Sequence, residues 1–331
     1  MKRLVAVVAA LSAAVGAASL APTAQAARAA PPPLSDCSVF PADNYWHADV
    51  SDLPVLSQSD AYVRSIGRAT GLKADFGSGL WDGGPIGIPY MLEDSSTRRV
   101  DVTFRWPDES DPGPYPVRRN PKIEGGADST GDRHILSVDT EDCRLYELYD
   151  AHRAGGRRQW RAGSGAIYDL GSNALRPAGW TSADAAGLPI FPGLVRRSEA
   201  HRGVIDHAIR FTAPETRDSY VWPARHEASS DSDPTLPPMG TWFRLKADVD
   251  LSGYTGEVRA ILEALKVHGM ILADNGSPWY LSGAPNPHWD NDALRALAEV
   301  TGADFEAVDA SCLRVSANSG QVTQTLPPRC Q

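Results

Sequence analysis

Residues 100–106, Val-Asp-Val-Thr-Phe-Arg-Trp, alternate apolar and polar side chains. That period of two is typical of a β-strand buried on one face. Other strand-like runs lie at 87–92, 134–138, 145–149, 165–170, 205–212, 219–222, 242–247 and 269–273. Glycine (29 residues) and proline (26) are spread through the chain and divide it into short elements. The sequence therefore predicts a mainly β protein built from many short strands.

Helical periodicity is confined to three segments, residues 59–69, 255–268 and 290–300. In the second, Val258, Ile261, Leu262 and Leu265 share one face, and Gly269 follows as a stop signal. Strands and helices do not alternate, which disfavours a Rossmann-type fold. We predict a single-domain β-sandwich or jelly roll with about three peripheral helices.

The first residues have the layout of a secretory signal peptide. Lys2 and Arg3 precede an uncharged apolar stretch, and Ala24-Gln25-Ala26 is a small-x-small cleavage site. We predict a signal peptide at 1–26, a disordered mature N-terminus at 27–36, one domain at 37–315 and a C-terminal tail at 316–331. Cleavage would give a secreted, extracellular protein with no membrane association.

Composition excludes several classes of partner. Loss of Lys2 and Arg3 with the leader leaves 30 basic against 41 acidic residues, a formal charge of −11. Nucleic acids and anionic lipids are bound by clustered Lys and Arg, so neither is an expected partner. We expect a monomer.

Four cysteines, Cys37, Cys143, Cys312 and Cys330, are consistent with an oxidising compartment. None forms a C-x-x-C motif, and three pairings are possible. We favour Cys37 with Cys143 and Cys312 with Cys330.

Three histidines lie in or beside short apolar runs: His134, His207 and His226. By strand alternation, His134 shares a face with Leu136 and Val138, while His207 and Arg210 point to opposite faces. Each could be a core histidine bonded to backbone carbonyls. Alternatively, the three could surround one cleft as acid–base groups or metal ligands. No H-E-x-x-H or H-x-H spacing supports a metal, so we expect no metal and no cofactor.

Carboxylates and aromatic side chains form a second set of candidates. Asp274 ends an apolar run and is followed by Trp279 and Tyr280, an arrangement that suits a sugar site, although Asp-Asn-Gly is also a strong turn sequence. Asp184 and Trp180 lie in a long loop, residues 173–194, of a length that is usually either functional or disordered, and its large apolar residues disfavour disorder. The predicted catalytic residues are His134, His207, Asp274, His226 and Asp184; the predicted substrate-binding residues are Trp180, Trp279, Tyr280, Arg133 and Trp81.

Several phrases resemble a group of exported actinobacterial proteins that lack an assigned activity. They include residues 40–44 (Phe-Pro-Ala-Asp-Asn), 75–79 (Asp-Phe-Gly-Ser-Gly), 81–89 (Trp-Asp-Gly-Gly-Pro-Ile-Gly-Ile-Pro), 108–115 and 123–126, together with 173–194 and 274–280. The resemblance covers nearly the whole mature chain. It implies export and a single domain, and it carries no catalytic assignment.

We therefore expect a secreted carbohydrate-active enzyme, a glycoside hydrolase or polysaccharide lyase acting on an extracellular polysaccharide. No G-x-S-x-G elbow, P-loop or dinucleotide fingerprint is present. The alternatives are a non-catalytic glycan-binding or cell-wall-associated module and a metal-dependent hydrolase built on the histidines. We expect His134, His207 and Asp274 on one concave face, roofed by the loop 173–194, with His226 beside them.

Overall fold

The computed structural model describes residues 37–155 and 159–330. The predicted signal peptide and the segment 27–36 lie outside the described residues. Within them no helix is long and apolar enough to cross a membrane. This described part of the chain is mainly β, with four α-helices beside several sheets.

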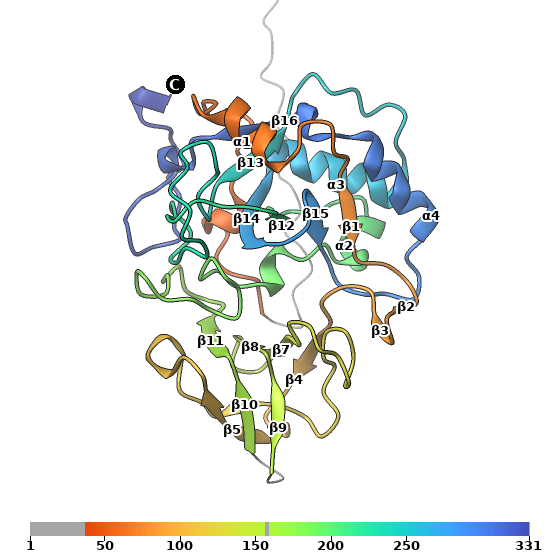
Figure 1. Ribbon diagram of the computed structural model, residues 1–331, viewed down its shortest axis with the longest axis vertical. Helices are drawn as coiled ribbons and strands as arrows, with labels where there is room; N and C mark the ends of the chain where they lie inside the picture. Colours follow the sequence, from red (N-terminus) through yellow and green to blue (C-terminus); the bar gives the residue numbers. More distant parts are fainter. Residues whose placement is uncertain (1–36, 156–158, 331) are drawn as a thin grey trace, which may run out of the picture. The chain divides into compact units, whose positions relative to one another are not determined.

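The largest sheet has six strands in the order β1-β15-β12-β14-β13-β16. Its strands are β1 (Lys73–Asp75), β12 (Ile209–Ala213), β13 (Trp242–Leu245), β14 (Met270–Asn275), β15 (Tyr280–Ser282) and β16 (Phe305–Val308). β1 runs parallel to β15, and β12 runs parallel to β14. Helix α3 (Gly256–Val267) packs against β13, and α1 (Ser59–Ile66) packs against β16 (Figure 1).

Two four-stranded sheets follow, in the orders β11-β8-β7-β4 and β6-β5-β10-β9. The first contains β4 (Tyr90–Glu93), β7 (Ile135–Asp139), β8 (Arg144–Tyr149) and β11 (Ser164–Asp169). The second contains β5 (Arg99–Phe104), β6 (Tyr115–Pro116), β9 (His152–Ala154) and β10 (Gln159–Ala162). A small hairpin joins β2 (Leu80–Trp81) to β3 (Gly84–Pro85). Parallel pairs, β4 with β7 and β5 with β10, occur in both four-stranded sheets.

Strand β7 is buried at all five positions because its two faces meet different apolar cores. Leu136 and Val138 belong to the main core, which also holds the six-stranded sheet. Ile135 belongs to a smaller core together with Trp160 of β10. The sheet that carries β7 therefore has apolar packing on both sides, and polar groups on either face must find partners inside the protein.

The predicted helices agree with the structure in part. Helix α3 begins after Thr255, and Val258, Ile261, Leu262 and Leu265 are buried as expected. α1 ends at Ile66, before Gly67, whose φ of +126° favours glycine. The third segment becomes α4 (Asn291–Leu294) followed by a 3₁₀ turn. A short helix, α2 (Arg197–His201), was not expected because five residues are too few for a visible period.

Two strand predictions need correction. The run 205–212 forms a strand only from Ile209 onward. Residues 219–222 form no strand; Tyr220 makes a single bridge to Met239 before the cis peptide bond of Pro223. The predicted tail also packs on the domain, where the Tyr45 amide donates to the Gly320 carbonyl. The C-terminal disulfide brings this segment back to the protein.

Both favoured disulfides are present, Cys37–Cys143 and Cys312–Cys330. They close loops of very different length, with sequence separations of 106 and 18 residues. Loop-closure entropy predicts that removing the longer cross-link costs about 1.5 kcal/mol more of the free energy of unfolding. Urea unfolding of the two double Cys→Ser variants tests this. Equal losses, or a larger loss for Cys312–Cys330, would contradict the prediction.

Candidate active site

A pocket of about 400 Å³ lies where the loop 173–194 meets the end of β14 and the residues before β7. It is lined by Trp106, Glu109, Asp132, His134, Tyr149, Ser164, residues 181–185, His226, Ala228, Asp274 and Asn275. Four of these carry carboxylates, from four separate regions of the chain: Glu109, Asp132, Asp184 and Asp274. We call it the acidic pocket.

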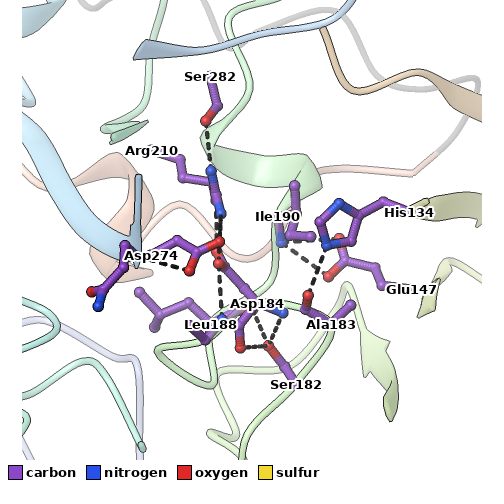
Figure 2. Close-up of polar contacts among 12 residues, drawn as sticks. His134, Glu147, Ser182, Ala183, Asp184, Leu188, Ile190, Arg210, Asp274 and Ser282 are labelled. Atoms are coloured by element: carbon purple, nitrogen blue, oxygen red, sulfur yellow. Dashed lines mark hydrogen bonds and ion pairs between the residues drawn. The ribbon is translucent and has the colours of Figure 1, made fainter. Parts of the chain in front are cut away.

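Arg210 of β12 organises the carboxylates behind this pocket (Figure 2). Its Nε and Nη2 donate to the two carboxylate oxygens of Asp184, at 2.8 and 2.7 Å. Nη2 also donates to Asp274 Oδ2 at 2.9 Å, and Nη1 to Ser282 Oγ at 2.7 Å. Arg210 and Asp184 are buried, so neither charge can be solvated by water in place of the other. The pair therefore fixes the loop to the six-stranded sheet.

Asp274 is the carboxyl group most suited to proton transfer. Burial and the charge of Asp184 raise the pKa of Asp274, and the Arg210 cation lowers it. The net result is a pKa of about 6. The Asn275 amide donates to Asp274 Oδ1 at 2.8 Å, which holds the group in place at the strand end. An acid with a pKa near the working pH can both give and accept a proton.

His134 lies on the opposite wall and is held at both ring nitrogens. Nδ1 donates to Glu124 Oε2 at 2.5 Å, and Nε2 donates to the Ala183 carbonyl at 2.9 Å. Burial lowers the pKa of His134, but the Glu124 carboxylate outweighs burial and raises it to about 9. His134 is therefore an imidazolium at neutral pH, and it holds the loop at Ala183 rather than offering a free nitrogen to a substrate.

Glu147 of β8 anchors the same loop from behind. Its carboxylate accepts the amides of Ile190, at 2.9 Å, and Phe191, also at 2.9 Å, and its side chain is fully buried. Burial raises the pKa of Glu147 to about 7. Glu147 pairs in register with Leu136, so it lies on the same face of the sheet as His134.

Four of the five predicted catalytic residues line the acidic pocket: His134, Asp184, His226 and Asp274. His207 is not among the lining residues, so the expected grouping of all three histidines needs correction. Its ring is buried, with Nδ1 2.8 Å from the Ala208 carbonyl and Nε2 3.3 Å from Glu199 Oε2. Burial lowers the pKa of His207, which fits a neutral histidine satisfied within the core.

Two predicted substrate-binding residues are inaccessible. Trp279 is 0% exposed, stacks between Phe211 and Phe305, and donates its indole N–H to the Gly67 carbonyl. Arg133 is buried, and its guanidinium donates to three backbone carbonyls. The Trp279 ring packs in the core and the Arg133 guanidinium is bound to backbone carbonyls, so neither side chain is accessible to a substrate.

The other predicted aromatic residues lie near the surface. Trp180 is half-buried under the Arg176 guanidinium and does not line the acidic pocket. Trp81 and Tyr280 line a separate groove, described below. The aromatic wall of the acidic pocket is instead formed by Trp106 and Tyr149, which stack at 6.3 Å between ring centroids.

Sequence reasoning missed Arg210, Glu124, Asp132, Glu109 and Trp106. Two signals were available. Asp132 lies two residues before His134, and Glu109 and Glu124 lie in the long Pro- and Gly-rich stretch 107–131. No signal in the sequence shows that Arg210 meets Asp184 and Asp274.

One group of side chains in the described part of the chain could hold a metal ion. Glu124, Asp132 and His134 have ligand atoms within 4.8 Å of one another. Two ligands of one tetrahedral zinc ion are about 3.3 Å apart, since each lies about 2.0 Å from the metal. The 2.5 Å contact of Glu124 with His134 is shorter, as expected for a hydrogen-bonded ion pair.

Removal of the Asp184 charge should destabilise the protein strongly. Asp184→Asn leaves the buried Arg210 with half of its ionic partners, which we expect to lower the free energy of unfolding by about 3–5 kcal/mol. Glu263→Gln is the matched control, because Glu263 pairs with Arg259 on the surface of α3 and should matter by about 0.5 kcal/mol or less. Urea unfolding measures both. Similar losses in the two variants would contradict the structural role of Arg210.

The His134–Glu124 pair should make stability depend on alkaline pH. The folded-state pKa of His134 is about 9, above its ordinary value of 6.5. The stabilisation is therefore complete below about pH 6.5 and is lost as the pH rises through 9. We expect the difference in unfolding free energy between the wild type and His134→Gln to shrink between pH 7 and pH 10. A difference independent of pH would show that the pair is not ionic.

Comparisons with known protein families, with curated proteins and with solved structures found no match for this chain. The acidic pocket joins a carboxyl group of near-neutral pKa, a second exposed carboxylate on Asp132 and an aromatic wall. That combination is suited to general acid–base catalysis on a small polar unit.

Proposed function

We propose that this protein is a secreted glycoside hydrolase that acts on a neutral extracellular polysaccharide in the acidic pocket. The observation that carries the proposal is Asp274, an acid with a pKa of about 6 in a pocket whose wall contains Trp106 and Tyr149. The pocket volume of about 400 Å³ falls within the range of about 300–1,000 Å³ usual for small-molecule sites. The apolar faces of sugar rings pack on such aromatic walls.

Glycoside hydrolysis uses two carboxyl groups, one that protonates the leaving oxygen and one that acts as base or nucleophile. Asp274 is the proton donor, because burial keeps part of its population neutral near pH 6. Asp132 is the second carboxylate, since it lines the same pocket and its charge raises the pKa of Asp274. His134 and Arg210 position the loop and the acid without touching the substrate.

The charge of the pocket favours hydrolysis over elimination by a lyase. Polysaccharide lyases act on uronates, whose carboxylate needs a nearby cation. Of the four carboxyl groups that line the acidic pocket, Asp184 and Asp274 are bound to Arg210, and Glu109 and Asp132 remain to repel an anionic ligand. The charge of His134 is paired with Glu124, and that of Arg210 with Asp184 and Asp274. A neutral sugar avoids the repulsion that a uronate would meet.

The two alternative functions have weaker support. A glycan-binding module that depends on Trp279 conflicts with the burial of that ring. A metal site built on three histidines lacks His207. Export rests on the sequence of the leader, and the two disulfides agree with it. The β-sandwich arrangement expected for the sheets stays a prediction.

Asp274→Asn should abolish turnover. A panel of neutral and acidic polysaccharides, screened by reducing-end release, identifies the substrate. On that substrate we expect Asp274→Asn to lower kcat by about 10²–10⁴-fold. Asp169→Asn is the matched control, because Asp169 is an exposed carboxylate at the end of β11 and lies outside the pocket. If the wild type releases products from none of the polysaccharides, or if Asp274→Asn keeps full activity, the proposal is wrong.

The pH profile gives an independent test of the acid. Asp274 must be protonated to donate, so kcat/KM of the wild type should fall as the pH rises through about 6. The profile is measured between pH 4 and pH 8 on the substrate found in the screen. A basic limb several pH units above 6 would assign the proton donor to another group.

A further inference from the structure

A second and larger cavity, of about 1400 Å³, lies next to the acidic pocket and has no role in the mechanism proposed above. We call it the groove. Five segments line it: residues 70–76, 81–87, 124–131, 277–280 and 291–298. Its volume is 3.5 times that of the acidic pocket, so it can hold several units of a ligand where the pocket holds few.

Trp81 stands at the groove on the β2–β3 hairpin with 79% of its surface exposed. The hairpin is fixed in place, because Gly84 packs so closely on Gly125 that a Cβ at Gly84 would lie 2.1 Å from the Gly125 carbonyl carbon. A large exposed indole on a fixed support presents a rigid apolar face on which a ligand ring can stack.

Tyr280 gives the groove a second aromatic ring. Lys73 Nζ donates to the Tyr280 hydroxyl at 2.9 Å and lies 4.6 Å from the ring centroid. The two residues are neighbours in the parallel β1–β15 pair, so the sheet register sets their separation. The Tyr280 ring is thereby held at one orientation beside the groove.

The groove and the acidic pocket share two structural elements. Glu124 lines the groove while its partner His134 lines the pocket. The end of β14 supplies Asp274 and Asn275 to the pocket, and the segment that follows supplies Ser277 and then Tyr280, the first residue of β15, to the groove. A chain-like ligand that leaves the pocket therefore meets the groove within a few residues of the proposed acid.

We infer that the groove binds the continuation of the polysaccharide chain whose reacting sugar occupies the acidic pocket, with Trp81 stacking on a sugar ring. The inference rests on the proposed function for the chemical class of the ligand. Four charged side chains of the groove are acidic and two are basic, which favours a neutral chain over an acidic one; they are Asp75, Asp82, Glu124 and Asp128, with Lys73 and Arg295. The enzyme would then act on long chains in preference to short glycosides.

Affinity electrophoresis tests the groove without requiring turnover. The wild type is run through native gels that each contain one polymer: laminarin, xyloglucan, glucomannan or glycol chitin. We expect retention by at least one of them, and a roughly tenfold or greater loss of affinity in Trp81→Ala. Leu80→Ala is the matched control, because Leu80 is 71% exposed on the same strand and does not line the groove. Retention by no polymer, or equal retention of wild type and Trp81→Ala, overturns the inference.

Asp274→Asn separates this inference from the proposed function. If both hold, Asp274→Asn is retained like the wild type and releases no product. If retention depends on Trp81 but the wild type releases no product from any polymer, hydrolysis is wrong and the groove stands. If the wild type hydrolyses polymers while Trp81→Ala has an unchanged KM for them, the groove is wrong and hydrolysis stands.

Discussion

The buried guanidinium of Arg210 is the constraint on which the candidate site depends. A cation that is 4% exposed must have its charge neutralised inside the protein. Its partners come from the loop 173–194 (Asp184), from β14 (Asp274) and from β15 (Ser282). The pair with Asp184 stabilises the loop, and the contact with Asp274 opposes the rise in that pKa. Arg210 therefore contributes both to the stability of the loop and to the pKa of Asp274.

The loop is also held from the other side by polar groups of a different sheet. His134 donates to the Ala183 carbonyl, and Glu147 accepts two amides from the loop's end. The pocket is thus formed between two sheets that both bond to one irregular segment, and its shape depends on directed hydrogen bonds. Irregular backbone is buried only where its amides and carbonyls find partners, and these side chains supply some of them.

How far the fold could be predicted follows from the length and burial of each element. The alternation at 100–106 locates β5, and the period of 3.6 locates α3 with its buried face. β2 and β3 have two residues each, which is too short for any period. Alternation also leaves strand direction open, so the parallel pair β4–β7 had no signal in the sequence. Direction is decided by long-range packing.

The site could be predicted only where strand geometry decides it. Counting alternate residues placed His134 on the face of Leu136 and Val138, and the ring lies on that side, toward the loop. The same count set Arg210 opposite His207, and the histidine was the predicted site residue. A histidine needs only one or two partners, and His207 finds them nearby in the Ala208 carbonyl and the Glu199 carboxylate. A buried guanidinium requires carboxylates, and Arg210 takes them from 26 and 64 residues away. Arg210, which needs carboxylate partners from distant parts of the chain, therefore determines which carboxyl groups meet in the pocket.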